Sequence, residues 1–133
     1  TWMIFEETTG GIVVRAMPAY QAARSVPHAD HYFWTYAIEI ENRSEETVQL
    51  RARRWRITDA NGLVREVAGP GVVGDTPILS PGDTYRYTSG CPLETPSGLM
   101  VGTYEMIDVK SGARFEIAIP AFALDGPSAA RMN

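Results

Sequence analysis

A glycine-spaced segment is the first place where this sequence could do chemistry. Residues 69–74 read Gly-Pro-Gly-Val-Val-Gly and match the Gly-x-Gly-x-x-Gly spacing of dinucleotide-binding loops. Such loops direct a helix N-terminus at a pyrophosphate. Here Asp75-Thr76-Pro77 follows and cannot open an amphipathic helix, which excludes a dinucleotide fold. Gly69, Gly71 and Gly74 therefore predict a tight inter-strand loop, and the open alternative is a nest of N–H groups that binds an anion.

A cluster of arginines could contribute to the same chemistry. Four arginines surround one tryptophan, namely Arg51, Arg53, Arg54 and Arg56 around Trp55. Guanidinium groups suit phosphate and carboxylate recognition, but strand side chains alternate, so the four cannot all point one way. We expect a solvated strand face that pairs with Glu39 and Glu41. The alternative is a pyrophosphate or nucleotide site, with weak hydrolysis and magnesium, in which Arg51, Arg53 or Arg65 joins the glycine loop.

Three potential metal ligands fall within one short segment, His28-Ala29-Asp30-His31. A metal site needs ligands held by rigid elements and supported by further hydrogen bonds, which a loop does not supply. We therefore expect a solvated loop and no bound cofactor. The alternative is an association of magnesium or cobalt with His28, Asp30 and His31.

Few residue types remain for catalysis. Cys91 is the single cysteine, which excludes an intrachain disulfide and a cysteine-based zinc cluster, and we expect a small half-buried residue rather than a nucleophile. Lys110 is the single lysine and lacks the preceding glycine of a phosphate-binding loop. The chain has neither a Gly-x-Ser-x-Gly nor a His-Glu-x-x-His motif. No catalytic set is recognisable, and we expect a protein that is not an enzyme.

Charge and hydropathy narrow the class of partner. The chain carries 12 Lys+Arg and 16 Asp+Glu, a formal net charge of −4, which argues against binding to nucleic acid. No apolar run approaches the roughly 20 residues of a membrane helix, which excludes membrane insertion. The 133 residues fit one domain, expected over residues 1–125, with a flexible tail over residues 126–133.

Alternation of apolar and polar residues dominates the chain and predicts strands. The clearest strand covers residues 32–42. The phase changes between Leu50 and Trp55, which predicts a β-bulge near residues 52–54. We expect Pro120 to end the last strand and residues 89–98 to form a long exposed loop. The expected strands are 12–17, 32–42, 48–58, 63–67, 78–79, 84–88, 99–108 and 113–119.

This spacing predicts an all-β fold, an antiparallel β-sandwich of seven or eight strands. No stretch of ten or more residues shows helical periodicity. The aromatic residues fall mostly at inward positions and predict a core. Tyr104 could be a corner tyrosine that ties a loop, as in other sandwich domains.

Several motifs occur in a fixed order between residues 11 and 124. They include Tyr32-Phe33-Trp34, Trp55-Arg56-Ile57-Thr58-Asp59-Ala60-Asn61-Gly62, Gly69-Pro70-Gly71-Val72-Val73-Gly74 and Tyr87-Thr88-Ser89-Gly90-Cys91-Pro92-Leu93. In this order the sequence resembles the bacterial ApaG family. The combination is far more specific than the glycine spacing alone.

The resemblance implies an immunoglobulin- or fibronectin type III-like sandwich and a cytoplasmic bacterial protein. Family members are associated with cobalt and magnesium resistance or efflux, and the domain is also fused to F-box and polymerase-interacting proteins, where it looks like an interaction module. The resemblance brings no catalytic residues. We expect a non-enzymatic module, monomeric or homodimeric, that presents a sheet edge and residues 89–98 to a protein partner and is linked only indirectly to metal efflux.

Overall fold

The computed structural model describes residues 3–127, and most of the predicted tail, residues 128–133, lies outside the described residues. Within the described part the chain forms nine strands and two short 3-10 helices. They are β1 Phe5–Thr9, β2 Ile12–Tyr20, η1 Ala22–Arg24, η2 Pro27–Ala29, β3 Tyr32–Asn42, β4 Val48–Asp59, β5 Val64–Pro70, β6 Ile78–Leu79, β7 Thr84–Leu93, β8 Ser97–Asp108 and β9 Arg114–Asp125. No helix in residues 3–127 has the length and apolar character needed to cross a bilayer.

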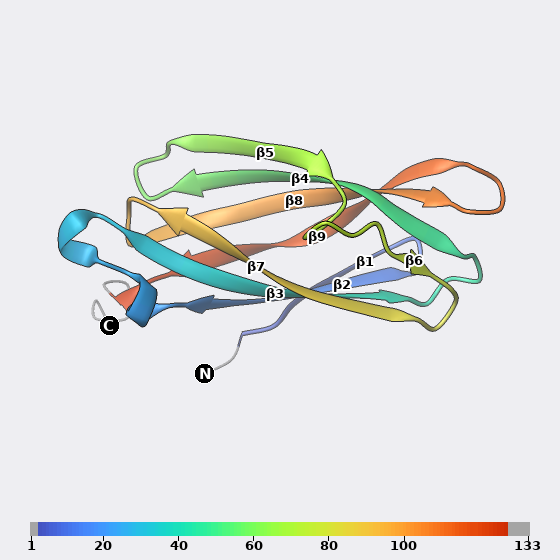
Figure 1. The fold of residues 1–133 in the computed structure, drawn as a ribbon, viewed down its shortest axis with the longest axis horizontal. Coiled ribbons are helices and arrows are strands. Elements are labelled where there is room, and N and C mark those ends of the chain that lie inside the picture. Colours follow the sequence, from blue (N-terminus) through green and yellow to red (C-terminus); the bar gives the residue numbers. More distant parts are fainter. Residues whose placement is uncertain (1–2, 128–133) are drawn as a thin grey trace.

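The strands form two antiparallel sheets that lie one above the other (Figure 1). One sheet has the order β1-β2-β3-β7, and the other has the order β5-β4-β8-β9, with β6 also paired to β4. The predicted all-β sandwich is confirmed. The strand missing from the prediction is β1, whose mostly exposed residues carry no apolar alternation and are ordered by pairing with β2.

The core lies between the sheets because the inward residues of each strand are apolar. In β3 every second residue is buried, from Tyr32 to Asn42. The largest fully buried side chains include Trp34 of one sheet and Tyr104 and Phe122 of the other. Burial of each such side chain contributes about 2–3 kcal/mol.

A β-bulge in β4 sets the direction of the arginines. The register shifts between Leu50 and Ala52, which leaves Arg51 as the extra residue, one position before the predicted range. As predicted, the bulge changes which alternate residues face the core. Before it the even-numbered Leu50 is buried, and after it the odd-numbered Trp55 is buried. Arg53 consequently shares the inward phase of Trp55.

Four strands run past their predicted ends: β2 continues through Pro18 to Tyr20, β5 to Pro70, β7 to Leu93 and β9 to Asp125. Residues 89–93 are not a loop but the second half of β7, paired with β3 from Tyr32↔Leu93 to Tyr36↔Ser89. Pro120 does not end β9, because it lies in a second bulge, where Met100 pairs with Phe122 and Gly102 with Ile119. A bulge tolerates the missing N–H of proline, and so does the free edge of an edge strand.

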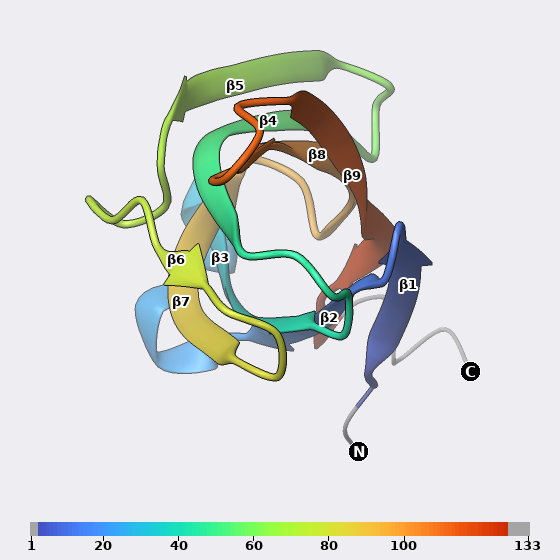
Figure 2. The ribbon, with the colours of Figure 1, turned by 90° about the vertical axis from the view of Figure 1, so that its right-hand side faces the viewer.

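The two sides of the sandwich differ (Figure 2). On one side β1 and β2 contact β9. On the other side β5 and β7 are edge strands of different sheets, and residues 71–77 run from β5 towards β6. We call this second side, made of β5, β7 and residues 71–77, the open side.

Candidate functional site

The glycine loop on the open side is a tight turn closed by its own backbone. The Val72 N–H donates to the Asp75 carbonyl and the Asp75 N–H donates to the Val72 carbonyl, both at 2.8 Å. The turn residues are Val73 with φ +42° and Gly74 with φ +84°. Gly71 has φ +61°, and a Cβ there would lie 2.3 Å from the Asp75 carbonyl oxygen. Glycine is therefore required at Gly71 for space as well as for conformation.

Arg53 holds this loop from inside. Its Nη1 donates to the carbonyl oxygens of Pro70 and Gly71, both at 3.0 Å. The guanidinium also covers Gly69, where a Cβ would lie 3.2 Å from Nη2. The alternative of a phosphate site required an arginine at the glycine loop, and Arg53 does lie there. Its hydrogen bonds, however, go to the carbonyl groups of the loop itself.

The other arginines do not converge on the loop. Arg51 is exposed, and only its carbonyl reaches the loop, where it accepts the Gly71 N–H at 2.8 Å. Arg54 and Arg56 have the outward phase of β4. Arg65 lies further along β5, where its Nη2 donates to the Pro92 carbonyl at 3.3 Å.

The expected pairing of this arginine cluster with Glu39 and Glu41 was wrong. Both glutamates lie on β3 in the opposite sheet. Glu39 accepts hydrogen bonds from Arg15 and Arg86, and Glu41 from Arg15 and Arg43. This ion network was missed, although the sign alternation of Arg15, Glu39 and Arg86 on predicted strands was a usable signal.

The polar groups that remain at the loop are few. Among residues 3–127 no acceptor is found for the N–H groups of Val73 and Gly74. The Asp75 carboxylate accepts a hydrogen bond from the Tyr85 hydroxyl at 2.8 Å, so a negative charge lies beside these two donors. An anion would meet two donors and one opposing carboxylate.

Tyrosine hydroxyls gather between the sheets behind Arg53. The hydroxyls of Tyr87 and Tyr104 hydrogen-bond each other across the sandwich, so Tyr104 does not tie a loop as expected. Burial raises the pKa of both, and the nearby Arg53 charge only partly opposes this. These hydroxyls stay neutral at neutral pH and hold the two sheets together.

The structure places Cys91 in the core and the two histidines at the surface. Cys91 is 2% exposed, so it is fully buried rather than half-buried as expected, and burial raises the pKa of its thiol more than the Arg65 charge lowers it. His28, Asp30 and His31 are exposed around η2. Within the part of the chain that is described, no three or more His, Cys, Asp or Glu side chains lie so that they could hold a metal ion.

Comparison with known proteins gives one family. The model of the ApaG domain matches residues 22–108. A Protein ApaG of Paramagnetospirillum magneticum is 55% identical over 124 residues, which cover 93% of this chain and 95% of that protein. A Protein ApaG of Mesorhizobium japonicum is 55% identical over 128 residues, which cover 96% and 98%.

Solved structures agree with the fold. An ApaA protein from Bordetella pertussis superposes with a TM-score of 0.84 and 42% identity, over 87% of this chain and 94% of that one. The C-terminal domain of wzt superposes with a TM-score of 0.56 at 10% identity, over 92% of this chain and 77% of that one, which is a likeness of fold alone.

Proposed function

The chain belongs to the ApaG family, and from this premise we propose that it is a non-enzymatic binding module that presents its open side to a protein partner. The supporting observation is that the side chains with the greatest potential for chemistry are already used within the fold or are held in their neutral form. Arg53 holds the glycine loop, and the buried tyrosines and Cys91 are neutral. The open side offers instead two strand edges and a turn held in place by side chains.

The connection at residues 71–77 has the character of a rigid contact surface. Arg53 anchors it at Gly71, the Gln49 amide donates to the Thr76 carbonyl at 3.1 Å, and Tyr85 binds Asp75. It displays Val73, which is 57% exposed and holds a positive φ that a β-branched side chain disfavours. Strain of this kind persists where the surroundings fix the conformation, and it concentrates at functional segments.

The proposal also covers the link to metal resistance, the cellular location and the oligomeric state. We place any link to cobalt or magnesium resistance in the partner, and we place the protein in the cytoplasm as a monomer or homodimer.

An affinity capture tests the module. The immobilised protein is exposed to extract of the source organism beside the variants Val73→Asp, on the connection, and Leu99→Asp, on the outer face of β8. Aspartate tolerates a positive φ, and both original side chains are exposed, so both variants should fold. We expect a protein that the wild type and Leu99→Asp retain and Val73→Asp loses. Equal retention by all three, or no enrichment, would count against the open side as the binding surface.

A second candidate is a weak site for a phosphate compound at the turn. The N–H groups of Val73 and Gly74, for which residues 3–127 supply no acceptor, favour it, and the Asp75 carboxylate opposes it. Titration with pyrophosphate, followed by amide resonances, should shift Val73 and Gly74 before all others if the site exists. Unmoved resonances at millimolar pyrophosphate exclude it.

A further inference from the structure

Strand β7 has one edge without a partner strand. Among the described residues it pairs with β3 alone. The Phe33 N–H donates to the Ser25 hydroxyl at 2.9 Å, on the far side of β3 from β7, so the Phe33↔Pro92 pair exchanges no hydrogen bonds. Because hydrogen-bonded and non-bonded pairs alternate, Tyr87, Ser89 and Cys91 bond to β3. The backbone groups of three residues therefore point away from it, namely Arg86, Thr88 and Gly90.

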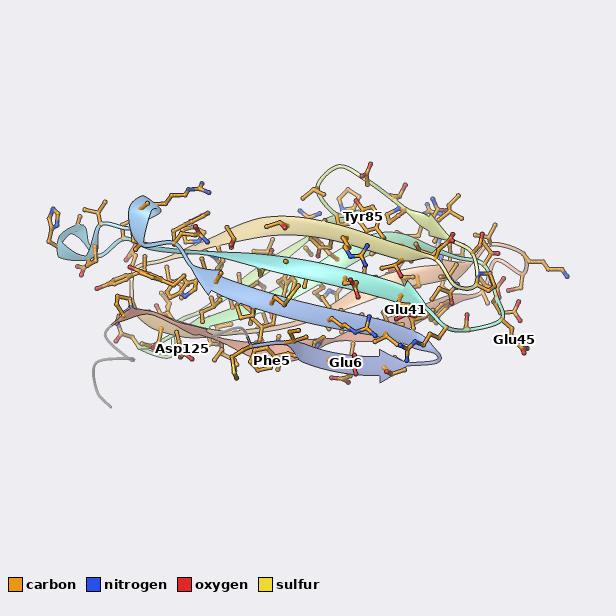
Figure 3. The ribbon with its side chains drawn as sticks, turned by 90° about the horizontal axis from the view of Figure 1, so that it is seen from below. Phe5, Glu6, Glu41, Glu45, Tyr85 and Asp125 are labelled. Atoms are coloured by element: carbon orange, nitrogen blue, oxygen red, sulfur yellow. The ribbon has the colours of Figure 1, made fainter. Side chains whose placement is uncertain are left out.

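The ends of this edge are covered, and its middle is not. At one end the Arg65 guanidinium reaches the Pro92 carbonyl. At the other end Tyr85 is tied to Asp75 of the connection, and Figure 3 shows Tyr85 on the side of β7 where the connection passes. Between them Arg86, Thr88 and Gly90 are exposed. Proteins protect such edges with proline or charge, here Pro92 and Arg86, and the stretch from Arg86 to Gly90 remains free to pair with an added strand.

Beside the middle of the edge the arginines dominate, while the Asp75 carboxylate lies at its Tyr85 end. Arg53 and Arg65 hydrogen-bond only to uncharged atoms, and within residues 3–127 neither forms an ion pair. Arg65 lies against β7, where its Nη2 donates to the Pro92 carbonyl at 3.3 Å and lies 3.9 Å from the Cys91 Sγ, while the Arg53 charge acts on the Tyr87 hydroxyl in the core. On the outer face the side chain of Arg86 is 71% exposed and pairs with Glu39 through Nε.

The added strand could come from a second copy of this chain or from another protein, and the charges near the edge favour the second source. A second copy of this chain would bring the same arginines together, with like charge against like charge. An acidic extended segment would place alternate side chains near Arg65 on the inner side and near Arg86 on the outer side. We propose that β7 receives an acidic, extended segment of a partner protein, which pairs with the backbone of Arg86, Thr88 and Gly90. This inference rests on the proposed function, since it names the partner chemistry of the same open side.

A proline substitution isolates the edge. Thr88→Pro removes an N–H that the fold does not use, so it should block the added strand and leave the β3 pairing intact. The matched control is Ala68→Pro on the edge strand β5. The Asp59 N–H donates to the Leu63 carbonyl and the Gly71 N–H to the Arg51 carbonyl, so alternation points the Ala68 N–H away from β4. Both residues are exposed.

The probe is a displayed library of random peptides of about nine residues, selected on the full chain. We expect acidic peptides whose affinity falls with salt, falls at least about tenfold in Thr88→Pro and changes less than about twofold in Ala68→Pro. Amide exchange on the wild-type complex should slow at Arg86, Thr88 and Gly90, which tests the site even if Thr88→Pro fails to fold.

Three results of the peptide selection would overturn the inference: no peptide is selected, the selected peptides are basic, or they bind Thr88→Pro as tightly as the wild type. A wild-type dimer in sedimentation that Thr88→Pro dissociates would show that the edge takes a second copy instead. If Thr88→Pro still captures the same protein from extract as the wild type, the edge inference fails while the binding module stands.

Discussion

Two groups of arginines in this protein differ in how their distance along the chain relates to their distance in space. Arg15 and Arg86 are far apart in the chain, yet both donate to Glu39 at 2.6 Å on the outer face of the four-stranded sheet. Figure 3 shows Glu6 and Glu41 of this network on one face. The arginines of residues 51–56 are adjacent in the chain but are dispersed by strand alternation and by the bulge at Arg51. Pairing register, not local density, brings charges together in a sheet.

The two groups also serve different acceptors. Glu6, Arg15, Glu39 and Arg86 are register neighbours on successive strands, so opposite charges alternate across the sheet. The hydrogen bond from Arg15 to Glu6 is the largest cause that raises the pKa of Arg15, and burial opposes it. Arg53 instead donates to backbone carbonyls, so its contacts fix a loop rather than another charge.

The largest effect should come from the loop that Arg53 holds. Gly71→Ala should lower the free energy of unfolding by about 3 kcal/mol, because the new Cβ meets the Asp75 carbonyl and φ is positive. Gly74→Ala shares the positive φ but has nothing within 4 Å, and it should cost about 1 kcal/mol. Urea denaturation compares the two, and equal costs would show that the loop relaxes freely.

Arg53→Met tests the hydrogen bonds by which Arg53 holds the glycine loop. It keeps much of the apolar length but leaves the Pro70 and Gly71 carbonyls without their charged donor, so we expect a loss of about 2 kcal/mol in urea denaturation. Arg51→Met, at the exposed bulge, should change stability by less than about 0.5 kcal/mol. Equal effects of the two substitutions would erase the distinction between a structural and a solvated arginine.

The sequence was sufficient for the features that follow from local alternation. The limits of β3 and the presence of a bulge between Leu50 and Trp55 both follow from which residues must face the core. The extension of β7 beyond residue 88 could not be predicted in this way. Gly90 and Pro92 indicate a loop locally, and only pairing with β3 makes them strand residues.

The candidate site was less predictable than the fold. The glycine spacing correctly indicated positive φ at Gly71 and Gly74, but not at Gly69, which lies in β5 and pairs with Arg53 instead of entering the loop. The partner of each arginine depends on register between distant strands, which no local pattern specifies. The open edge of β7 depends on the same register, because the sequence of a strand does not reveal how many neighbours it has.

The ion network should respond to pH through Glu39. Burial would raise the pKa of Glu39, but hydrogen bonds from Arg86 and Arg15 outweigh it and hold that pKa below its usual 4.5. The carboxylate therefore stabilises the fold above the ordinary value, and this contribution disappears as the pH falls through the lowered value.

Glu39→Gln should consequently cost about 1 kcal/mol at neutral pH. The difference from wild type should vanish in acid, as measured by urea denaturation across pH. Glu105→Gln is the control, since Glu105 is exposed and forms no ion pair with the described residues. A cost that persists below the lowered pKa would mean that packing, and not charge, makes Glu39 important.

The smallest effect should be a gain in stability at the turn of the open side. Val73 holds φ +42° with a β-branched side chain that is 57% exposed, so replacement by glycine relieves strain and loses little burial. Glycine also gives the unfolded chain more freedom, which offsets part of the relief, and Val73→Gly should stabilise the protein by about 0.5 kcal/mol. A loss in urea denaturation would show that the valine packs against its surroundings. A gain in stability with loss of partner capture would show that the strained valine is kept for binding and not for folding, unlike the ion network on the opposite sheet.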